Sequence, residues 1–316
     1  MLKIKNLTLA SDILLGPMAG VTDLPFRRIC REYGCKTTTS EMISAKALHY
    51  QDKKTKQLLE KGEDETPFIV QIFGSDPLIM AESAKKIEDM GIADVLDINM
   101  GCPAPKIVNN GDGSALMKNE ALAFDVARAV ANAISLPVTV KFRLGWDEEN
   151  MNYLSFGKAM EQAGANALTL HARTRTQFYA GQADWQCIKN LKETVSIPVI
   201  ASGDIFCRDD ILKVKSETGC DGVMVARGAL GNPFIFSENE KEIQSDKNAV
   251  LDAAIRHLGY IVSCKGEYIG VREARKHMCW YIKGMHGAAQ TKVLINGCET
   301  QRDMENALNT LRNEKK

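Results

Sequence analysis

The sequence predicts an α/β protein, a (β/α)8 TIM barrel followed by a small all-helical C-terminal domain. Eight short apolar or β-branched runs alternate with longer amphipathic stretches up to about residue 240. From there to the end of the chain the pattern is helical, without a convincing strand. A length of 316 residues can hold one barrel and a small extra domain. We therefore expect a barrel domain at residues 1–240 and a helical domain at residues 241–316.

Each candidate strand is a short run of apolar or β-branched residues that ends in small or polar ones. A strand of a parallel sheet that is covered on both faces reads as such a nearly continuous run. In chain order the candidates are Ile13–Pro17, Thr37–Glu41, Phe68–Phe73, Val95–Asn99, Val138–Phe142, Ala167–His171, Val199–Ser202 and Gly222–Ala226.

Between these runs, apolar residues recur at the spacing of amphipathic helices, and several of the helical stretches stop at a glycine. The candidate helices are Leu24–Tyr33, Pro77–Met90, Ala121–Ala133, Leu154–Ala163, Trp185–Thr194 and Asp209–Thr218, with a shorter element after Ser44. A doubly wound open sheet stays the alternative, because the sequence alone does not show that the sheet closes.

Composition excludes several classes of protein. The net charge is zero, so any binding of nucleic acid must use a local patch. The nine cysteines form no C-x-x-C pair, which argues for reduced thiols in a cytoplasmic protein without a metal framework. The first residues lack the long apolar core of a signal peptide, and no apolar run is long enough for a membrane span. No obligate protein partner is evident.

Polar side chains gather where the candidate strands end. The carboxyl ends of barrel strands form one rim, where the catalytic groups of TIM barrels sit, so these residues predict a site. A buried strand gains nothing from a polar group at its end unless that group meets a partner. The residues are Gln71, Asn99, Cys102, Lys141, Arg143, His171, Arg173, the run Ser202-Gly203-Asp204, and Ala226-Arg227.

The last two strand ends match the needs of a phosphate. Small residues let backbone N–H groups approach its oxygens, and Arg227 adds positive charge. Neither G-x-G-x-x-G after the first strand nor a P-loop is present, which disfavours a Rossmann site. Lys141 could stabilise a reduced flavin or form a Schiff base, and the amide of Gln71 and the ring of His171 could hydrogen-bond a flavin.

Cys102 is the strongest candidate for a catalytic group. It stands between Gly101 and Pro103, without a second cysteine nearby for a disulfide. A free thiol has a pKa of about 8.5, so it is protonated near neutral pH and suits a general acid better than a nucleophile.

Ten runs lie in the order expected for one family along nearly the whole chain. They are Gly16–Asp23, Ser40–Met42, Asp97–Pro103, Gly113–Met117, Lys141–Arg143, His171–Arg175, Ala183–Trp185, Gly231–Phe234, Arg275–His277 and Trp280–Gly284. In these runs the chain resembles the tRNA-dihydrouridine synthase family, and within it the bacterial B-type branch. Two positions depart from the family, which usually has Asn at Ser202 and Gly at Ala226.

The resemblance implies an FMN enzyme that reduces the C5=C6 bond of particular uridines in tRNA, with NADPH as reductant. Hydride would pass from the flavin to C6, and Cys102 would protonate C5. The residues implied to hold FMN are Pro17, Met18, Ala19, Gln71, Lys141, His171, Ser202, Gly203, Asp204, Ala226 and Arg227. Asn99, Arg143 and Arg173 are candidates for the uracil edge or a neighbouring phosphate.

The C-terminal domain carries the charge that RNA needs. Between Arg256 and Lys292 there are seven basic residues against two acidic ones, and Arg272, Arg275 and Lys276 are the candidates for binding tRNA. Three other functions stay open from the residues alone. They are an FMN barrel that reduces a free pyrimidine or enone, a Schiff-base aldolase at Lys141, and a non-catalytic RNA-binding protein.

Overall fold

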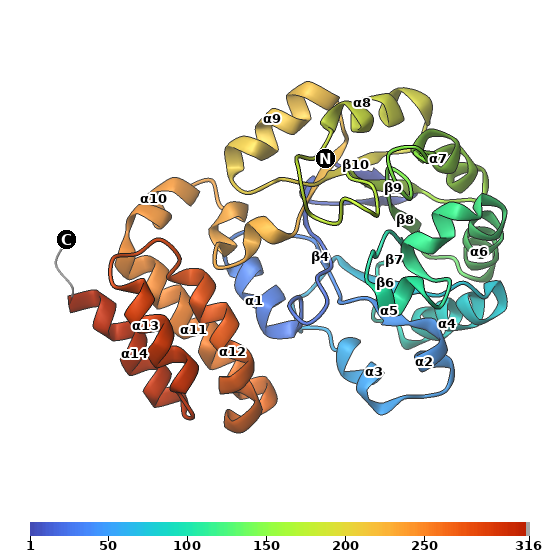
Figure 1. Ribbon diagram of the computed structural model, residues 1–316. Coiled ribbons are helices and arrows are strands. Elements are labelled where there is room, and N and C mark those ends of the chain that lie inside the picture. The colour runs from blue at the N-terminus through green and yellow to red at the C-terminus, as the bar shows by residue number, and fades with distance from the viewer. Residues whose placement is uncertain (314–316) are drawn as a thin grey trace. The chain divides into compact units, whose positions relative to one another are not determined.

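The computed structural model describes residues 1–313 and confirms the predicted TIM barrel with helices after it (Figure 1). Parallel strands follow one another in the sheet order β3-β11-β10-β9-β8-β7-β6-β4. A bridge between Leu14 and Thr37 joins the two edge strands, and Leu15 N donates to Thr37 O at 3.0 Å. Because each barrel strand lies beside its neighbour in sequence, the doubly wound alternative is wrong.

The strands match the sequence expectation closely, except around the second one. The barrel strands are β3 (Ile13–Leu15), β4 (Thr38–Thr39), β6 (Phe68–Phe73), β7 (Val95–Met100), β8 (Val138–Arg143), β9 (Ala167–His171), β10 (Val199–Ser202) and β11 (Gly222–Val225). The expected strand Thr37–Glu41 is shorter, and β5 (Ile43–Ser44) also pairs with β6.

Helices cover the strands on the outside of the sheet (Figure 1). They are α4 (Pro77–Met90), α6 (Glu120–Ala133), α7 (Tyr153–Gln162), α8 (Trp185–Thr194) and α9 (Arg208–Thr218). The other helical segments of this part of the chain are α2 (Ala45–His49), α3 (Lys53–Leu58), α5 (Pro105–Val108) and η1 (Gly113–Lys118). Helix α4 shows why the ends fall where they do. Asp76 accepts from two N–H groups of its first turn, and Gly91 ends it in the left-handed conformation at φ 66°.

An N-terminal hairpin, which the sequence did not predict, packs against the beginnings of the barrel strands. It pairs β1 (Lys3–Ile4) with β2 (Leu7–Thr8) in antiparallel fashion. Its apolar side chains share one buried cluster with the first residues of β7 and β9, Val95 and Ala167. The hairpin thus covers the amino end of the barrel, and the carboxyl end is left to the polar residues.

The chain divides into two compact units. The barrel unit comprises Met1–Leu24, Lys36–Ile205 and Asp209–Ala226. The helical unit comprises Pro25–Cys35, Phe206–Arg208 and the chain from Arg227 onward. Within the helical unit lie α1 (Leu24–Glu32), η2 (Arg227–Ala229), η3 (Pro233–Phe236), α10 (Glu240–Ser245), α11 (Lys247–Lys265), α12 (Glu267–Tyr281), α13 (Ala288–Gly297) and α14 (Gln301–Asn313). The expected assignment of FMN binding to residues 1–240 and tRNA binding to 241–316 stays a prediction.

Helix α1 is a member of the helical unit although it follows the first barrel strand in the chain. Its Phe26 ring lies 5.7 Å from that of His257, and Tyr33, just after it, meets Phe234 edge-on at 4.6 Å. The guanidinium of Arg256 donates to Tyr33 Oη at 2.6 Å. These contacts make α1 part of the core of the helical unit.

Helices suited to cross a membrane are not found in residues 1–313, since none is both long and apolar enough. In the same residues all nine cysteines are free, and no group of three or more His, Cys, Asp or Glu side chains could hold a metal ion.

Candidate active site at the barrel rim

Cys102 lies just beyond the end of β7, and the side chain of Asn99 fixes the backbone around it. Asn99 Oδ1 accepts hydrogen bonds from the N–H groups of Gly101 at 3.0 Å and Cys102 at 2.9 Å. The Cys102 side chain is half-buried. Two N–H groups held by one amide oxygen fix the backbone that carries the thiol.

The segment that follows Cys102 is anchored on it. Ser114 donates to Cys102 O through its N–H at 3.1 Å and through its hydroxyl at 2.9 Å. Gly113 has φ 61°, and a Cβ there would lie 2.9 Å from the same carbonyl oxygen, so only glycine fits. Ser114 is therefore a positioning residue, although no role was predicted for it from the sequence.

Asn99 is in turn held by a chain of buried hydrogen bonds that runs across three strands. Its Nδ2 donates to Gln71 Oε1 at 2.8 Å, and Gln71 Nε2 donates to Asp97 Oδ2 at 2.7 Å. Thr139 Oγ1 donates to the other oxygen of Asp97 at 2.5 Å. Because Asp97 accepts from Gln71 Nε2, it fixes the direction of the Gln71 amide, and so that of Asn99.

Strand register explains how this row of hydrogen bonds forms. Gln71, Asp97 and Thr139 are in-register neighbours on β6, β7 and β8, and Asn99 is the neighbour of Lys141 two residues further on. Side chains at i and i+2 share one face of a strand. Asp97 therefore lies behind Asn99 on the same face of β7, between the site and the barrel core.

Burial shifts the pKa values of three groups in this region. It raises the pKa of Asp97 to about 6, against the hydrogen bonds from Thr139 and Gln71. It lowers the pKa of Lys141 to about 8, with Arg143 adding to the effect and Asp97 opposing it. It also raises the pKa of the Cys102 thiol, against the N–H of Ala104 and the charges of Arg143 and Lys141. The thiol is therefore protonated at neutral pH.

Arg143 and Arg173 are almost fully buried, at 2% and 1% exposure, and they bind backbone carbonyls. Arg143 donates to Gly101 O at 2.8 Å and to Thr174 O and Phe178 O at 2.9 Å each. These bonds tie the Cys102 segment to the loop that follows β9. Arg173 donates to Ala180 O and Gly181 O, and its Nη2 lies 2.6 Å from Asp204 Oδ2.

The run Ser202-Gly203-Asp204 forms a close turn at the end of β10. Asp204, at φ 54°, accepts from Arg173 and from Ala183 N, so its carboxylate faces the protein. Gly203 has φ 116°, and a Cβ there would lie 3.2 Å from the ring of His171. This close approach and the positive φ favour glycine, and a small residue at this strand end is what a phosphate site would need.

Lys141 and His171 lie on neighbouring strands of the same rim. Within the described chain no residue hydrogen-bonds to Lys141 Nζ. A half-buried ammonium without a partner, beside the buried amides of Gln71 and Asn99, fits the polar edge of a flavin ring. His171 ends β9 in register with Arg143, and its ring lies 6.3 Å from that of Tyr179.

The remaining residues predicted to hold the cofactor lie at the two ends of the barrel sequence. Pro17 and Met18 are half-buried and Ala19 is exposed after β3, in a turn where Thr22 N donates to Met18 O at 3.0 Å. Ala226 is half-buried and ends the barrel unit. Arg227 opens the last segment of the helical unit, where its guanidinium lies 5.5 Å from the centre of the Phe206 ring.

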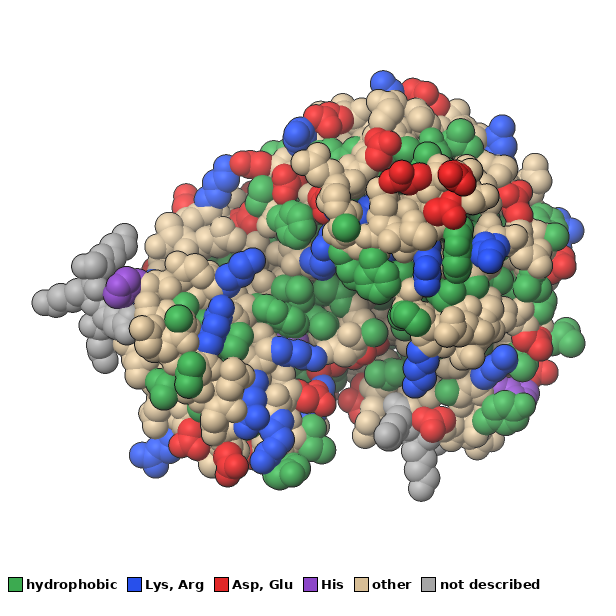
Figure 2. Space-filling view, in the orientation of Figure 1, with side chains coloured by type: hydrophobic (Ala, Val, Ile, Leu, Met, Phe, Trp, Pro, Cys, Tyr) green, Lys and Arg blue, Asp and Glu red, His purple; other side chains and the backbone are tan. Residues whose placement is uncertain are grey.

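Arg272, Arg275 and Lys276 all lie on α12, in the helical unit. Figure 2 shows Lys and Arg side chains (blue) gathered on the visible face of the helical unit. Lys276 is exposed, Arg272 lies over the ring of Tyr268 at 3.8 Å, and Arg275 donates to Cys298 O at 2.6 Å.

Part of the basic excess is neutralised within the helical unit. Lys265 forms an ion pair with Glu273, and Arg256 one with Glu32.

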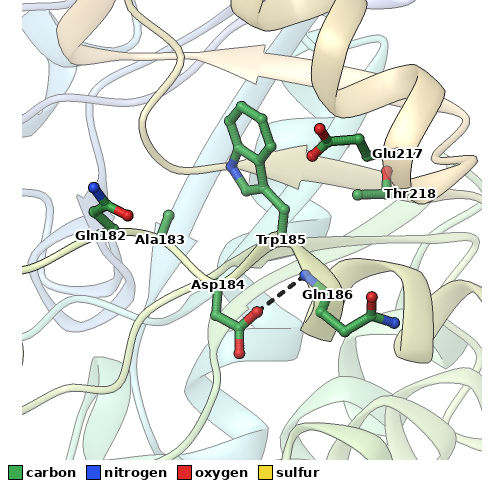
Figure 3. A pocket seen from close by; sticks show the side chains of 7 residues that line it. All are labelled: Gln182, Ala183, Asp184, Trp185, Gln186, Glu217 and Thr218. Carbon is green, nitrogen blue, oxygen red and sulfur yellow. Dashed lines mark hydrogen bonds between the residues drawn. The ribbon is translucent and has the colours of Figure 1, made fainter.

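A pocket of about 450 Å³ lies beside the barrel rim, where α8 begins (Figure 3). Trp185 lines it, and its indole N–H donates to Gly203 O at 2.9 Å. Asp184 accepts from Gln186 N at 3.0 Å and thereby caps α8. The lining residues are Gln182, Ala183, Asp184, Trp185, Gln186, Glu217 and Thr218, none of which the sequence assigned to the site.

Comparison with known proteins decides the family. A sequence model described as dihydrouridine synthase (Dus) matches residues 14–316. This chain belongs to the dihydrouridine synthase family. It is 42% identical over 304 residues to a probable tRNA-dihydrouridine synthase of Rickettsia bellii, covering 94% of this chain and 93% of that one. It is 41% identical over 297 residues to tRNA-dihydrouridine synthase B of Pseudomonas aeruginosa, covering 92% and 89%.

Solved structures of similar fold are much more distant in sequence. A 2-naphthoyl-CoA reductase superposes with a TM-score of 0.58 at 11% identity, covering 77% of this chain and 51% of that one. Histamine dehydrogenase from Rhizobium sp. 4-9 gives 0.56 at 13% identity, covering 87% and 50%. This chain thus spans about half the length of those proteins, and the likeness concerns the fold alone.

Membership of the family confirms the resemblance seen in the sequence and implies a flavin cofactor and a tRNA substrate. The roles of the individual residues stay predictions. Asp97, Thr139 and Ser114 were not assigned. A carboxylate inside the apolar run Val95–Met100 was the one signal that could have pointed to Asp97.

Proposed function

We propose that this protein is a tRNA-dihydrouridine synthase that uses FMN, with NADPH as the source of electrons. Family membership and relatives about 40% identical over most of the chain support the reaction. The observation that carries the residue assignment is Cys102, a protonated thiol fixed through Asn99 at the same rim as Lys141.

The chemistry divides between the cofactor and the chain. When bound, reduced FMN supplies the hydride that adds to C6 of the uracil ring. The electron pair left at C5 takes the proton of Cys102, and the thiolate is then reprotonated from water. A thiol whose pKa is raised by burial stays protonated until that moment, as a general acid must.

The rim residues bind and orient. Lys141 would hold the polar edge of the flavin, and its charge would stabilise the reduced ring. Gln71 and His171 would contact the same ring, and Ser202–Asp204 and Ala226–Arg227 its phosphate. Pro17–Ala19 would border the ring. Asn99 would present Cys102 to the uracil, and Arg143 and Arg173 would shape the loop that faces the base.

RNA binding supplies the energy to bring a uridine to this rim. Unstacking one base costs a few kcal/mol, which phosphate contacts must return. We assign these contacts to the basic face of α12, which carries Arg272, Arg275 and Lys276. An enzyme of this kind works on tRNA in the cytoplasm.

The test is reduction of an unmodified tRNA transcript by the full-length protein with FMN and NADPH. Dihydrouridine is mapped by mass spectrometry of nuclease fragments, with free uridine as a parallel substrate. We expect dihydrouridine at defined positions of the tRNA and little turnover of uridine. Equal turnover of free uridine would favour the barrel that reduces a free pyrimidine, and no bound flavin would overturn both functions.

A further inference from the structure

Two cationic side chains of the barrel unit lie over a single indole ring. Lys118 Nζ and the guanidinium carbon of Arg175 are each 4.6 Å from the centre of the Trp146 ring. Lys118 ends η1, Trp146 follows β8, and Arg175 follows β9. These segments come after the strands that carry Cys102, Lys141 and His171, so the cluster belongs to the rim of the candidate active site.

Backbone hydrogen bonds hold the three residues together. Arg175 N donates to Gly145 O at 2.9 Å and Thr176 N to Trp146 O at 3.0 Å, which pairs the two loops. Asn152 Nδ2 donates to Met117 O at 2.9 Å and so ties the residue before Lys118 to the same loop. A ligand would therefore meet a site whose parts are already in place.

The two cations of this cluster have no direct carboxylate partner within residues 1–313. Neither Lys118 nor Arg175 forms an ion pair with a carboxylate in that range. Asp147, the acid beside Trp146, instead accepts from the backbone and side-chain nitrogens of Asn150, at 2.9 and 2.6 Å. Each cation lies 4.6 Å from the centre of the same ring, and an anion bound next to them would offset their positive charge.

Arg175 also has a donor without an acceptor. Its Nε is buried and has no hydrogen-bond partner in the described chain. Buried donors are almost always satisfied in folded proteins, so an orphaned guanidinium N–H indicates an acceptor that the chain itself does not supply. Guanidinium and phosphate match well, because two N–H groups can meet two phosphate oxygens.

We propose that Lys118, Trp146 and Arg175 form a phosphate-binding site that holds the RNA backbone next to the uridine being reduced. The inference rests on the proposed function. The phosphate of NADPH has the same chemistry, but the exposed position of Lys118 suits a polyanion that runs along the rim. Trp146 keeps both cations in place, and Arg175 supplies the directed hydrogen bonds.

The experiment compares Arg175→Gln, Lys118→Met and the double variant with wild type, in full-length flavin-loaded protein. Binding of an unmodified tRNA transcript is measured from 50 to about 200 mM KCl, a range over which phosphate contacts weaken strongly. Losing one phosphate contact should raise Kd about 5–10-fold and make the slope of log K against log salt shallower by about 0.7–0.9. The double variant should show the larger change.

Two controls separate charge from structure. Arg175→Lys keeps the charge and should keep the salt slope of wild type, although its affinity falls. Lys158→Met removes an exposed lysine on α7 and should change neither quantity. The visible flavin spectrum of each variant reports whether the barrel is intact.

Kinetics distinguish the two sources of phosphate. We expect KM for tRNA to rise while kcat and KM for NADPH stay unchanged. A rise in KM for NADPH alone would assign the site to the dinucleotide and overturn the RNA assignment. Unchanged tRNA affinity and salt slope in the double variant would overturn the site itself. If wild type binds tRNA but forms no dihydrouridine, the proposed function fails, and the salt slopes still test this site.

Discussion

The barrel unit and the helical unit bury their polar side chains in different ways. In the barrel, Asp97, Gln71 and Asn99 are linked by hydrogen bonds that end at the backbone of Cys102. In the helical unit, the rings of His257 and His277 lie 5.0 Å apart in an aromatic core. The first arrangement fixes a reactive group, whereas the second fills space in the core of the unit.

The difference teaches where a change should affect chemistry and where it should affect stability or RNA affinity. In a row of hydrogen-bonded side chains, a substitution at one end changes the orientation of the group at the other end, because each amide orients the next. An aromatic cluster mainly loses packing energy when one ring is changed. We therefore expect substitutions in the buried hydrogen bonds of the barrel to change turnover, and substitutions in the helical unit to change stability or RNA affinity.

The largest expected effect is that of Cys102→Ala. The variant should keep its flavin and accept hydride from NADPH, but dihydrouridine formation should fall on the order of 10²–10⁴-fold, because the proton donor is lost. Stopped-flow reduction of the flavin and mass spectrometry of the tRNA measure the two halves separately. Product at the wild-type rate would remove Cys102 from the mechanism.

The second test is Lys141→Met, which keeps most of the length of the side chain and removes its charge. Hydrogen bonds to a charged group contribute about 1.5–3 kcal/mol, so flavin affinity should fall roughly 10–100-fold. Equilibrium dialysis of FMN against the apoprotein gives this value. Wild-type affinity together with wild-type turnover would contradict the assignment of Lys141.

The third test asks whether the buried hydrogen bonds from Asp97 through Gln71 and Asn99 position the thiol of Cys102. Asp97→Asn can still accept from Gln71 and donate to the Thr139 hydroxyl, so it should stay close to wild type. Asp97→Leu should lower kcat about tenfold or more, since an error of about 1 Å in placing a reacting group can cost ~10²-fold. KM for tRNA should not change in either variant.

Alkylation of Cys102 in the oxidised enzyme, followed by peptide mass spectrometry, checks the same point without turnover. Its rate and pH profile should differ from wild type in Asp97→Leu and agree with it in Asp97→Asn. Identical profiles in all three proteins would show that the hydrogen bonds of Asp97 do not position the thiol.

The fourth test concerns the surface of the helical unit. Arg272→Gln with Lys276→Gln should weaken tRNA binding by about tenfold and reduce the salt slope by about 0.7–0.9 for each lost phosphate contact. Flavin content and the reduction of flavin by NADPH should not change. Filter binding over a salt series measures the slope, and a slope equal to that of wild type would place the RNA elsewhere.

The smallest effect is on the pH dependence of stability, and its sign differs between the units. Burial raises the pKa of Asp97 to about 6, so the native state holds its proton longer than the unfolded state. This group therefore costs stability as pH rises from about 4 to about 6. Burial and the neighbouring His257 hold the pKa of His277 well below its usual value, so this group costs stability as pH falls below about 6.5.

Each contribution is bounded at about 1.4 kcal/mol per pH unit for one proton. Urea unfolding of wild type, Asp97→Asn and His277→Phe between pH 4 and about 7.5 resolves them. The stability of wild type relative to Asp97→Asn should fall as pH rises from about 4 to about 6, and its stability relative to His277→Phe should fall as pH drops below about 6.5. Parallel curves for all three proteins would contradict both expectations.

The sequence alone determined the barrel, the order of its elements and the residues at its rim. It could do so because strands, helices and their ends leave local signals: apolar runs, helical periodicity, and glycine after a helix. Runs such as Asp97–Pro103 and His171–Arg175 pointed to the family for the same reason, since their residues are neighbours in the chain.

Tertiary structure decided what each side chain contacts. Helix α1 is adjacent in sequence to the first barrel strand, yet its Phe26 packs on His257, more than two hundred residues away. Arg143 and Arg173 bind carbonyls of a loop, and hydrogen bonds through Gln71 and Asn99 link Asp97 to the backbone of Cys102. Such contacts depend on strand register and on chain closure over long distances, which periodicity does not encode.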